Sequence, residues 1–154
     1  MPLTQLLFSF HGRIGRQTYW LWNLGYYLTI IVFMLTVSRW LPSFAAYLWP
    51  LLLLGLLLPD LAVTAKRWHD RDKSSWWLLL NLPLLLGRMG MPVGETAMAT
   101  APNWWETTLA LLALGCGSWI LVECGFLAGN AADNRFGKSP HAISANHRDD
   151  PEKE

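Results

Sequence analysis

Residues 66–73 form the densest group of chemically capable side chains in this sequence. Four cations, two carboxylates and one histidine lie within these eight positions. His69 beside Asp70 has the residue types of an acid–base pair, and the cations have the charge that attracts anionic lipid headgroups, worth about 1 kcal/mol each. A salt-bridged turn, with Ser74 or Ser75 capping the next helix, explains the same residues. We favour the turn over headgroup or partner binding, and both over catalysis.

Two arginines precede the first long apolar run. Arg13 and Arg16 stand three residues apart, so on a helix they would share one face. At the membrane surface that face would meet lipid phosphates or a partner carboxylate. A positively charged membrane anchor is the simpler interpretation of the pair.

Residues 134–140 form a third polar cluster, just beyond the last apolar run. Gly137 can adopt a positive φ, and the proline three residues later blocks helix continuation, so the segment is predicted to be a fixed turn. Arg135 would then reach Asp70 or Asp72 if both loops lie on one side of the membrane. This contact is the simplest interpretation of the second and third clusters together.

Asp60 and Glu123 are acids inside apolar stretches. A carboxylate near the centre of a bilayer costs about 2.5–3.5 kcal/mol on insertion scales, which makes each acid a candidate functional residue. However, Lys66 follows Asp60 by six residues, about 9 Å along a helix, and Arg67 follows by seven on the same face. We therefore expect Asp60 to form a salt bridge or reach the interface, in preference to relaying protons or ions. Glu123 is expected to behave in the same way.

No catalytic residue, metal or cofactor is predicted. The histidines have no ligand partners at the spacing of a metal site. Cys116 and Cys124, eight residues apart, would lie about 12 Å apart on one helix, which is beyond the reach of a disulfide.

The elements that position these clusters are predicted from composition. The 154 residues are 53% apolar and 15% charged, against an average charged content of about 25%. Between residues 17 and 65 the charged residues are Arg39 and Asp60. A water-soluble globule is excluded, and a net charge of +1 without a long basic run argues against nucleic acid as a partner.

Four membrane spans are expected, at about residues 17–38, 41–65, 74–93 and 105–128, in one domain formed by residues 1–140. The third is the weakest, because its uncharged run covers only residues 74–87 and contains Pro83. The predicted fold is an all-α polytopic transmembrane bundle, with three spans plus a re-entrant segment as the alternative. Residues 141–154 are expected to be a disordered polar tail.

Positive charge sets the expected orientation. With four spans, ten cations lie on one side and Arg39 and Arg88 on the other, so the ten are predicted to be cytoplasmic, with both termini. Apolar residues at helical spacing before the first span predict a short amphipathic helix on the inner leaflet: Leu3, Leu6, Leu7, Phe10 and Ile14. A stripe of small residues in the fourth span would allow close packing within the bundle or between subunits: Ala110, Ala113, Gly117 and Cys124.

Three ordered motifs resemble a known family, the YhaH-like bacterial inner-membrane proteins of domain-of-unknown-function family 805. The resemblance implies an integral protein of the bacterial cytoplasmic membrane without an established activity. Two features depart from the family pattern: residues 88–106 insert a loop, and Asp60 replaces a small or neutral residue. The matching stretches are Phe10-His11-Gly12-Arg13-Ile14-Gly15-Arg16 with Tyr19-Trp20, Lys66-Arg67-Trp68-His69-Asp70 with Ser75-Trp76-Trp77, and Asn134-Arg135-Phe136-Gly137 with Pro140.

The leading hypothesis is a non-enzymatic membrane protein that binds anionic headgroups or a partner through a cytoplasmic Arg/His/Trp-rich face. Its partners would be membrane lipids, further copies of the chain or another membrane protein. A small transporter or channel subunit with Asp60 and Glu123 in a shared cavity is the alternative, and an enzyme using His69 and Asp70 is a third hypothesis. The candidate binding residues are Arg13, Arg16, Trp20, Arg67, His69, Asp70, Ser75, Trp76, Trp77, Asn134, Arg135, Phe136 and Gly137.

Overall fold

The computed structural model of the chain describes residues 2–89 and 103–140. These residues contain helices and no strand, so the predicted all-α class is confirmed. The predicted tail, residues 141–154, lies outside the described part. The main helices are α1 (Leu3–Phe8), α2 (Arg16–Trp40), α3 (Ala45–Asp70), α4 (Asn81–Met89) and α5 (Trp104–Ile120). Shorter elements adjoin them: the 3-10 turns η1 (Pro42–Phe44) and η2 (Ser75–Leu80), and the π-helical turn η4 (Leu121–Phe126).

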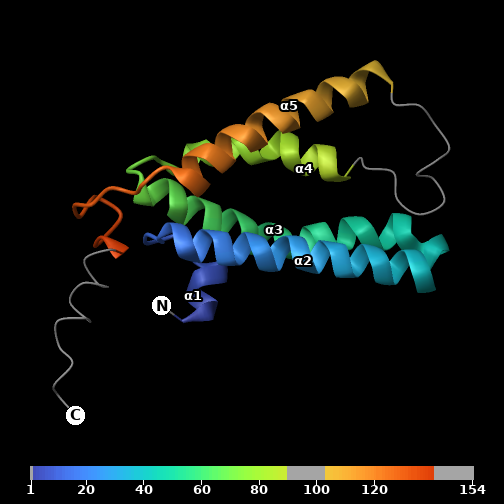
Figure 1. The fold of residues 1–154 in the computed structure, drawn as a ribbon, viewed down its shortest axis with the longest axis horizontal. Coiled ribbons are helices and arrows are strands. Elements are labelled where there is room, and N and C mark those ends of the chain that lie inside the picture. Colours follow the sequence, from blue (N-terminus) through green and yellow to red (C-terminus); the bar gives the residue numbers. More distant parts are fainter. Residues whose placement is uncertain (1, 90–102, 141–154) are drawn as a thin grey trace, which may run out of the picture.

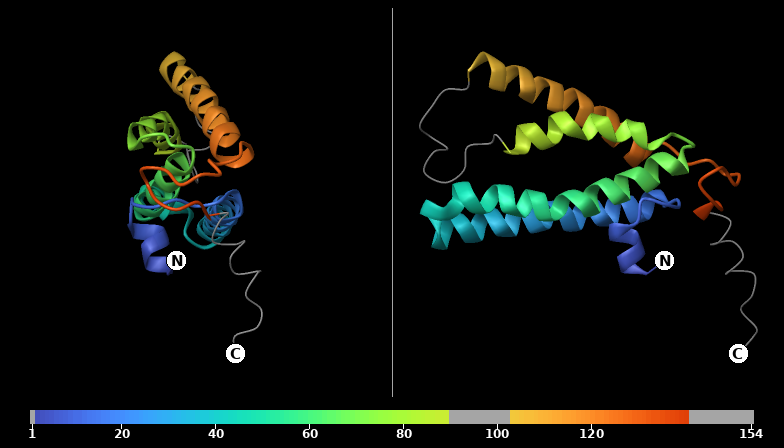
Figure 2. Two further views of the ribbon diagram at one scale, coloured as in Figure 1. Left: turned by 90° about the vertical axis from the view of Figure 1, so that its left-hand side faces the viewer. Right: turned by 180° about the vertical axis from the view of Figure 1, so that it is seen from behind.

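Four helices form two antiparallel pairs. α2 and α3 make a hairpin along the long axis of the molecule, and α4 lies against α5 (Figure 1). We call the end where α2 begins and α3 and η4 finish the motif end, and the opposite end the far end. Toward the far end α5 leans away from α2 and α3, as the end view and the view from behind show (Figure 2).

Three helical segments are long and apolar enough to cross a membrane. They are Arg16–Trp40, Pro42–Asp70 and Trp104–Phe126. The predicted third span is shorter: η2 and α4 hold 6 and 9 residues, about 25 Å of helix, against a hydrocarbon core of about 30 Å. Four full-length spans are therefore not confirmed, although the chain still returns to the motif end through α5.

The small-residue stripe of α5 packs inside the bundle, against α4. A Cβ atom added to Gly117 would lie 3.4 Å from Leu84, and one added to Gly87 would lie 3.4 Å from Ala113. Close approach of the two backbones thus requires small residues on both helices. Of the two predicted uses of this stripe, the structure shows the one within the bundle.

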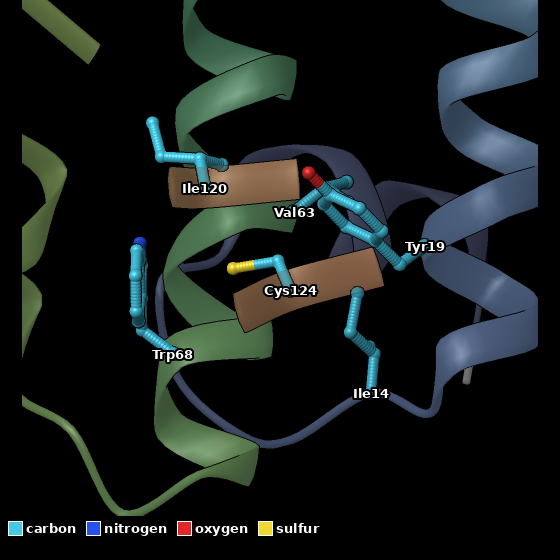
Figure 3. Close-up of a cluster of buried hydrophobic side chains, with 6 residues drawn as sticks. All are labelled: Ile14, Tyr19, Val63, Trp68, Ile120 and Cys124. Atoms are coloured by element: carbon cyan, nitrogen blue, oxygen red, sulfur yellow. The ribbon is translucent and has the colours of Figure 1, made fainter. Parts of the chain in front are cut away.

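The core lies around the last third of α3. Every residue from 62 to 70 is buried, on all sides of the helix. Beside it, side chains from α2, α3, α5 and η4 and from the segment before α2 form one apolar cluster (Figure 3). Its members are Ile14, Tyr19, Val63, Trp68, Ile120 and Cys124. Because a helix buried all round has no lipid-facing side, this part of α3 is the centre that other segments enclose.

The predicted amphipathic helix is present but shorter than its apolar pattern. α1 ends at Phe8, whereas Ile14 lies in an extended stretch and belongs to the core. α1 runs across the bundle axis near the motif end (Figure 1). It is held there because Lys66 Nζ on α3 donates a hydrogen bond to the Leu6 carbonyl oxygen, 2.7 Å away.

Candidate functional site

Asp70, the last residue of α3, is the centre of a buried charge network at the motif end. Its Oδ1 accepts a hydrogen bond from Arg13 Nε at 3.1 Å, and its Oδ2 accepts one from Arg67. The Asp70 and Arg67 side chains are 0% exposed and that of Arg13 is 1% exposed. The main chain is tied here as well, because Asn130 N donates to the Asp70 carbonyl oxygen at 2.8 Å.

Arg13 does not share a helix face with Arg16, so that expectation is wrong. α2 begins only at Arg16, and the chain before it is not helical, with a bend at Gly12, φ 98°. Arg13 consequently points inward and also donates to three carbonyl oxygens of the C-terminal loop. These acceptors belong to Asn130, Ala132 at 2.8 Å and Gly137 at 3.1 Å.

Arg67 donates hydrogen bonds to carbonyl groups at the C-terminal end of the helix formed by α5 and η4. Its Nε donates to the Cys124 carbonyl oxygen and its Nη2 to that of Leu127, each at 2.6 Å. The last carbonyl groups of a helix have no donor within that helix, and cations near them are favoured by the helix dipole. The buried guanidinium group therefore supplies both charge and hydrogen bonds to this helix end.

Two side chains of α2 cap neighbouring carbonyl groups of η4. Trp20 Nε1 donates to Gly125 O at 3.0 Å, and Arg16 donates to Phe126 O at 3.2 Å. Carbonyl groups without a donor in their own helix thus account for the direction of several motif side chains. Trp20, a predicted binding residue, therefore has its indole nitrogen engaged within the protein.

Glu123 lies in η4 and pairs with two cations of the loop after α3. Lys73 Nζ is 2.8 Å from its Oε1, and Arg71 Nε is 2.8 Å from its Oε2. The Arg71 contact is an ion pair by distance, without hydrogen-bond alignment. Lys73 also lies over the Trp77 ring, 4.4 Å from its centroid. The predicted pairing of Glu123 with cations is confirmed.

His69 pairs with Ser75 and not with Asp70. Its Nε2 is 2.9 Å from the Ser75 Oγ atom, and its ring stacks on Phe136 with 3.9 Å between centroids. Both carboxylate oxygens of Asp70 are held by arginines, so the suggested His69–Asp70 acid–base pair does not form. Ser74 is the N-cap residue of η2, and no side chain forms a capping hydrogen bond there. The predicted serine cap is therefore not formed at this position.

The third motif meets the second, as predicted. Arg135 Nε lies 3.2 Å from Asp72 Oδ1, so the partner is Asp72 while Asp70 is already occupied. Asn134 Nδ2 donates to the His69 carbonyl oxygen at 2.8 Å. Gly137 has φ 134°, which confirms the predicted turn. The Arg135–Asp72 pair is 61% and 50% exposed, and such pairs contribute little to stability.

Asp60 makes no salt bridge with any residue that the structure describes, so the predicted salt bridge is wrong, and its reaching the interface stays a prediction. Its Oδ1 accepts a hydrogen bond from Trp22 Nε1 at 3.3 Å. Lys66 turns to α1 and Arg67 to Asp70, because both lie on a segment enclosed by other elements. Asp60 instead lines two cavities of about 480 and 490 Å³.

The motif residues therefore divide into an inner and an outer set. The buried members lock the C-terminal loop, α3 and the segment before α2 together: Arg13, Arg67, His69 and Asp70. The exposed ones lie at the surface: Arg16, Trp20, Ser75, Trp76, Trp77, Arg135 and Gly137. No group of three potential metal ligands occurs among the residues described. Sequence reasoning missed the Ser75–His69 contact and the role of η4, because neither a 3-10 nor a π turn has a clear sequence signal.

Comparison with known proteins finds relatives of unknown activity. A family model described as "Protein of unknown function (DUF805)" matches residues 7–138. A protein of Escherichia coli (strain K12) named "Uncharacterized protein YiiR" is 33% identical over 145 residues, which cover 93% of each chain. The protein of the same name from Escherichia coli O157:H7 matches equally. No solved structure matches.

Proposed function

The chain belongs to the DUF805 family of proteins of unknown function, and from that premise we propose that it is a non-enzymatic integral membrane protein that binds anionic lipid headgroups. The three apolar helices support membrane integration. The proposed binding surface is the motif end, and its residues are the cations left exposed there, not the buried arginines. We name these the outer cations: Arg16, Arg135 and Lys138.

The observation that carries this proposal is the place of α1. It lies across the bundle axis at the level of the motif end (Figure 1), with Leu3 73% and Phe8 63% exposed. If the long helices cross the bilayer, α1 lies along its surface near the motif end, and its exposed apolar side chains are available to that surface. Apolar area together with positive charge is what an interfacial lipid-binding surface requires.

Tryptophans at the same end support this placement. Trp76 is 78% exposed and Trp20 is 42% exposed, and exposed indole rings prefer the headgroup level. The Trp20 indole N–H is already bonded to η4, so its ring is held in place.

Removing the outer cations is expected to reduce binding of anionic lipid. The triple variant Arg16→Gln, Arg135→Gln, Lys138→Gln loses charges worth about 1 kcal/mol each near an anionic surface. We expect roughly a tenfold or greater loss of phosphatidylglycerol enrichment among lipids that co-purify with the detergent-extracted chain. Arg39→Gln, at the exposed far end of α2, is the matched control and should leave the enrichment unchanged. Equal anionic lipid with the triple variant and the wild type would count against the proposal, and a protein that co-purifies in a charge-dependent way would favour a partner instead.

We further propose that the motif end faces the cytoplasm of a bacterial inner membrane, since positively charged segments stay on that side. In a Cys116→Ala background, Arg16→Cys and Lys138→Cys should react with a membrane-impermeant maleimide only in inverted vesicles. Arg39→Cys should react in intact spheroplasts. Cys124 is fully buried and should not react under either condition. Labelling of the two motif-end positions from opposite sides would contradict both this orientation and the fold.

Transport with Asp60 and Glu123 in one cavity is not supported by the geometry. Neither of the two cavities lined by Asp60 is lined by Glu123, which is paired with Arg71 and Lys73. The non-enzymatic part of the proposal rests on His69, which pairs with Ser75 and, within the described residues, with no acid, since arginines hold Asp70. An enzymatic activity of the purified chain would contradict this part of the proposal, and an activity unchanged in His69→Ala would exclude a catalytic role for His69.

A further inference from the structure

A group of polar residues lies inside the bundle, apart from the buried charge network around Asp70. Four of them line both cavities described above: Tyr26 of α2, Asp60 of α3, and Asn81 and Arg88 of α4. The first cavity lies between α3, η2 and α4, and the second is bounded by α2, α4 and α5. Each has the volume of a ligand site in a folded protein, about 300–1,000 Å³.

The two charged members of this group are not paired with each other. Arg88 donates to the hydroxyl groups of Tyr26 at 2.9 Å and Tyr27 at 3.0 Å. Asp60 accepts from the Trp22 indole, and within the described residues no cation lies within 4.0 Å of it. A charge in this environment normally pairs with another charge, because its desolvation is costly. The Asp60 carboxylate and the Arg88 guanidinium group thus line the same two cavities. Among the described residues, their side chains have neutral hydrogen-bond partners only.

Asn81 adds an unused donor. Its Nδ2 atom is buried and has no hydrogen-bond partner among the described residues. Buried amide groups are almost always satisfied, so this one is available to a further molecule. Together the three side chains offer one acceptor for a cation and two donors for an oxyanion.

The depth and the walls of the cavities indicate where a ligand comes from. Asp60 precedes the end of α3 by ten residues, and Tyr26 follows the start of α2 by ten, so both lie about 15 Å from the motif end. Exposed leucines stand on the rims of both cavities. In a membrane such leucines face lipid tails, so each cavity opens laterally to the bilayer. The rim leucines are Leu79 and Leu82 for the first cavity and Leu24 and Leu114 for the second.

We propose that this site binds an aminophospholipid. The primary ammonium group contacts Asp60, the phosphate contacts Arg88 and Asn81, and an acyl chain lies along the leucines of the first cavity. Charge complementarity selects this ligand: a lipid without a cation leaves Asp60 facing a phosphate, and a quaternary ammonium group has no N–H donor for the carboxylate. The site is separate from the outer cations, so this inference does not depend on the function proposed above.

The first test uses the unaltered chain. Native mass spectrometry of the chain in detergent should retain phosphatidylethanolamine roughly tenfold more strongly than phosphatidylcholine, which the outer cations do not distinguish by net charge, the effect expected for one charge-assisted hydrogen bond. Retention should fall stepwise through the N-methyl and N,N-dimethyl analogues. Equal retention of all these lipids would overturn the proposal, as would displacement of the lipid by soluble phosphoethanolamine at the same concentration.

Variants then assign the two charges. Asp60→Asn should reduce retention of phosphatidylethanolamine to the level of phosphatidylcholine, and Arg88→Gln should weaken retention of every phospholipid. Glu106→Gln and Arg39→Gln are exposed controls on other helices and should keep the wild-type preference. Preference for the primary amine retained in Asp60→Asn would contradict the assignment, and the analogue series on the wild type tests the proposal even if a variant does not fold.

Discussion

Replacing Asp70 with alanine should lower the free energy of unfolding by about 3–5 kcal/mol, the cost of leaving buried charges without their partner. Asp70 is the sole acid, among the described residues, in ion-pair contact with Arg13 and Arg67. Without it, two guanidinium groups remain side by side in a buried site. Titration of SDS into detergent micelles, followed by fluorescence of the ten tryptophans, measures the loss.

The control for Asp70 lies two residues away. Asp72→Ala removes the partner of Arg135, a pair that is mostly exposed, and exposed pairs contribute about 0–1 kcal/mol. Two acids only two positions apart, one at the end of α3 and one just after it, should therefore differ several-fold in their effect. If Asp70→Ala unfolded at the same SDS fraction as Asp72→Ala, the buried network would not be holding the motif end together.

Substitution of Gly129 by alanine is the second change expected to have a large effect. A Cβ atom there would overlap the Asp70 carboxylate, which cannot yield because arginines fix both of its oxygens. Overpacking of a closed site costs about 1–3 kcal/mol, and here it also separates an ion pair. We expect the same unfolding assay to show a loss between those of Asp72→Ala and Asp70→Ala.

Gly55→Ala is the matched control for Gly129. It lies within α3, and a Cβ atom there meets nothing within 4 Å. Alanine is favoured over glycine in a helix by about 0.5–1 kcal/mol, so this variant should be as stable as the wild type or more so. A loss at Gly55 equal to that at Gly129 would show that the assay responds to any glycine replacement.

Much of the membrane character follows from the sequence. Long uncharged runs predict the three full-length helices, because transfer of an apolar segment into lipid depends mainly on its own composition and length. The turn at Gly137 was equally accessible, since a positive φ is a local property. The contact between the second and third motifs also followed, once the direction of each helix was assigned.

The length of the third predicted span was harder to predict from the sequence. η2 winds as a 3-10 turn and α4 ends, as far as described, at Met89. Whether a weakly apolar stretch spans the membrane is decided by its neighbours, and here α5 packs closely on α4 through Gly87 and Gly117. Packing against another helix therefore shaped this segment, and composition alone does not report it.

Charge, length and apolar content were determined by the sequence alone, whereas the tertiary structure decided which cations are buried and which are exposed. Arg13 and Arg67 were predicted to be binding residues at the membrane surface, yet they are buried. Their partners include carbonyl groups of residues 124–132, more than fifty positions away in the chain. Every residue has a carbonyl group, so the sequence does not mark which of them a helix end leaves unsatisfied. Only the fold brings those acceptors to the arginines and leaves Asp60 and Arg88 facing a common space.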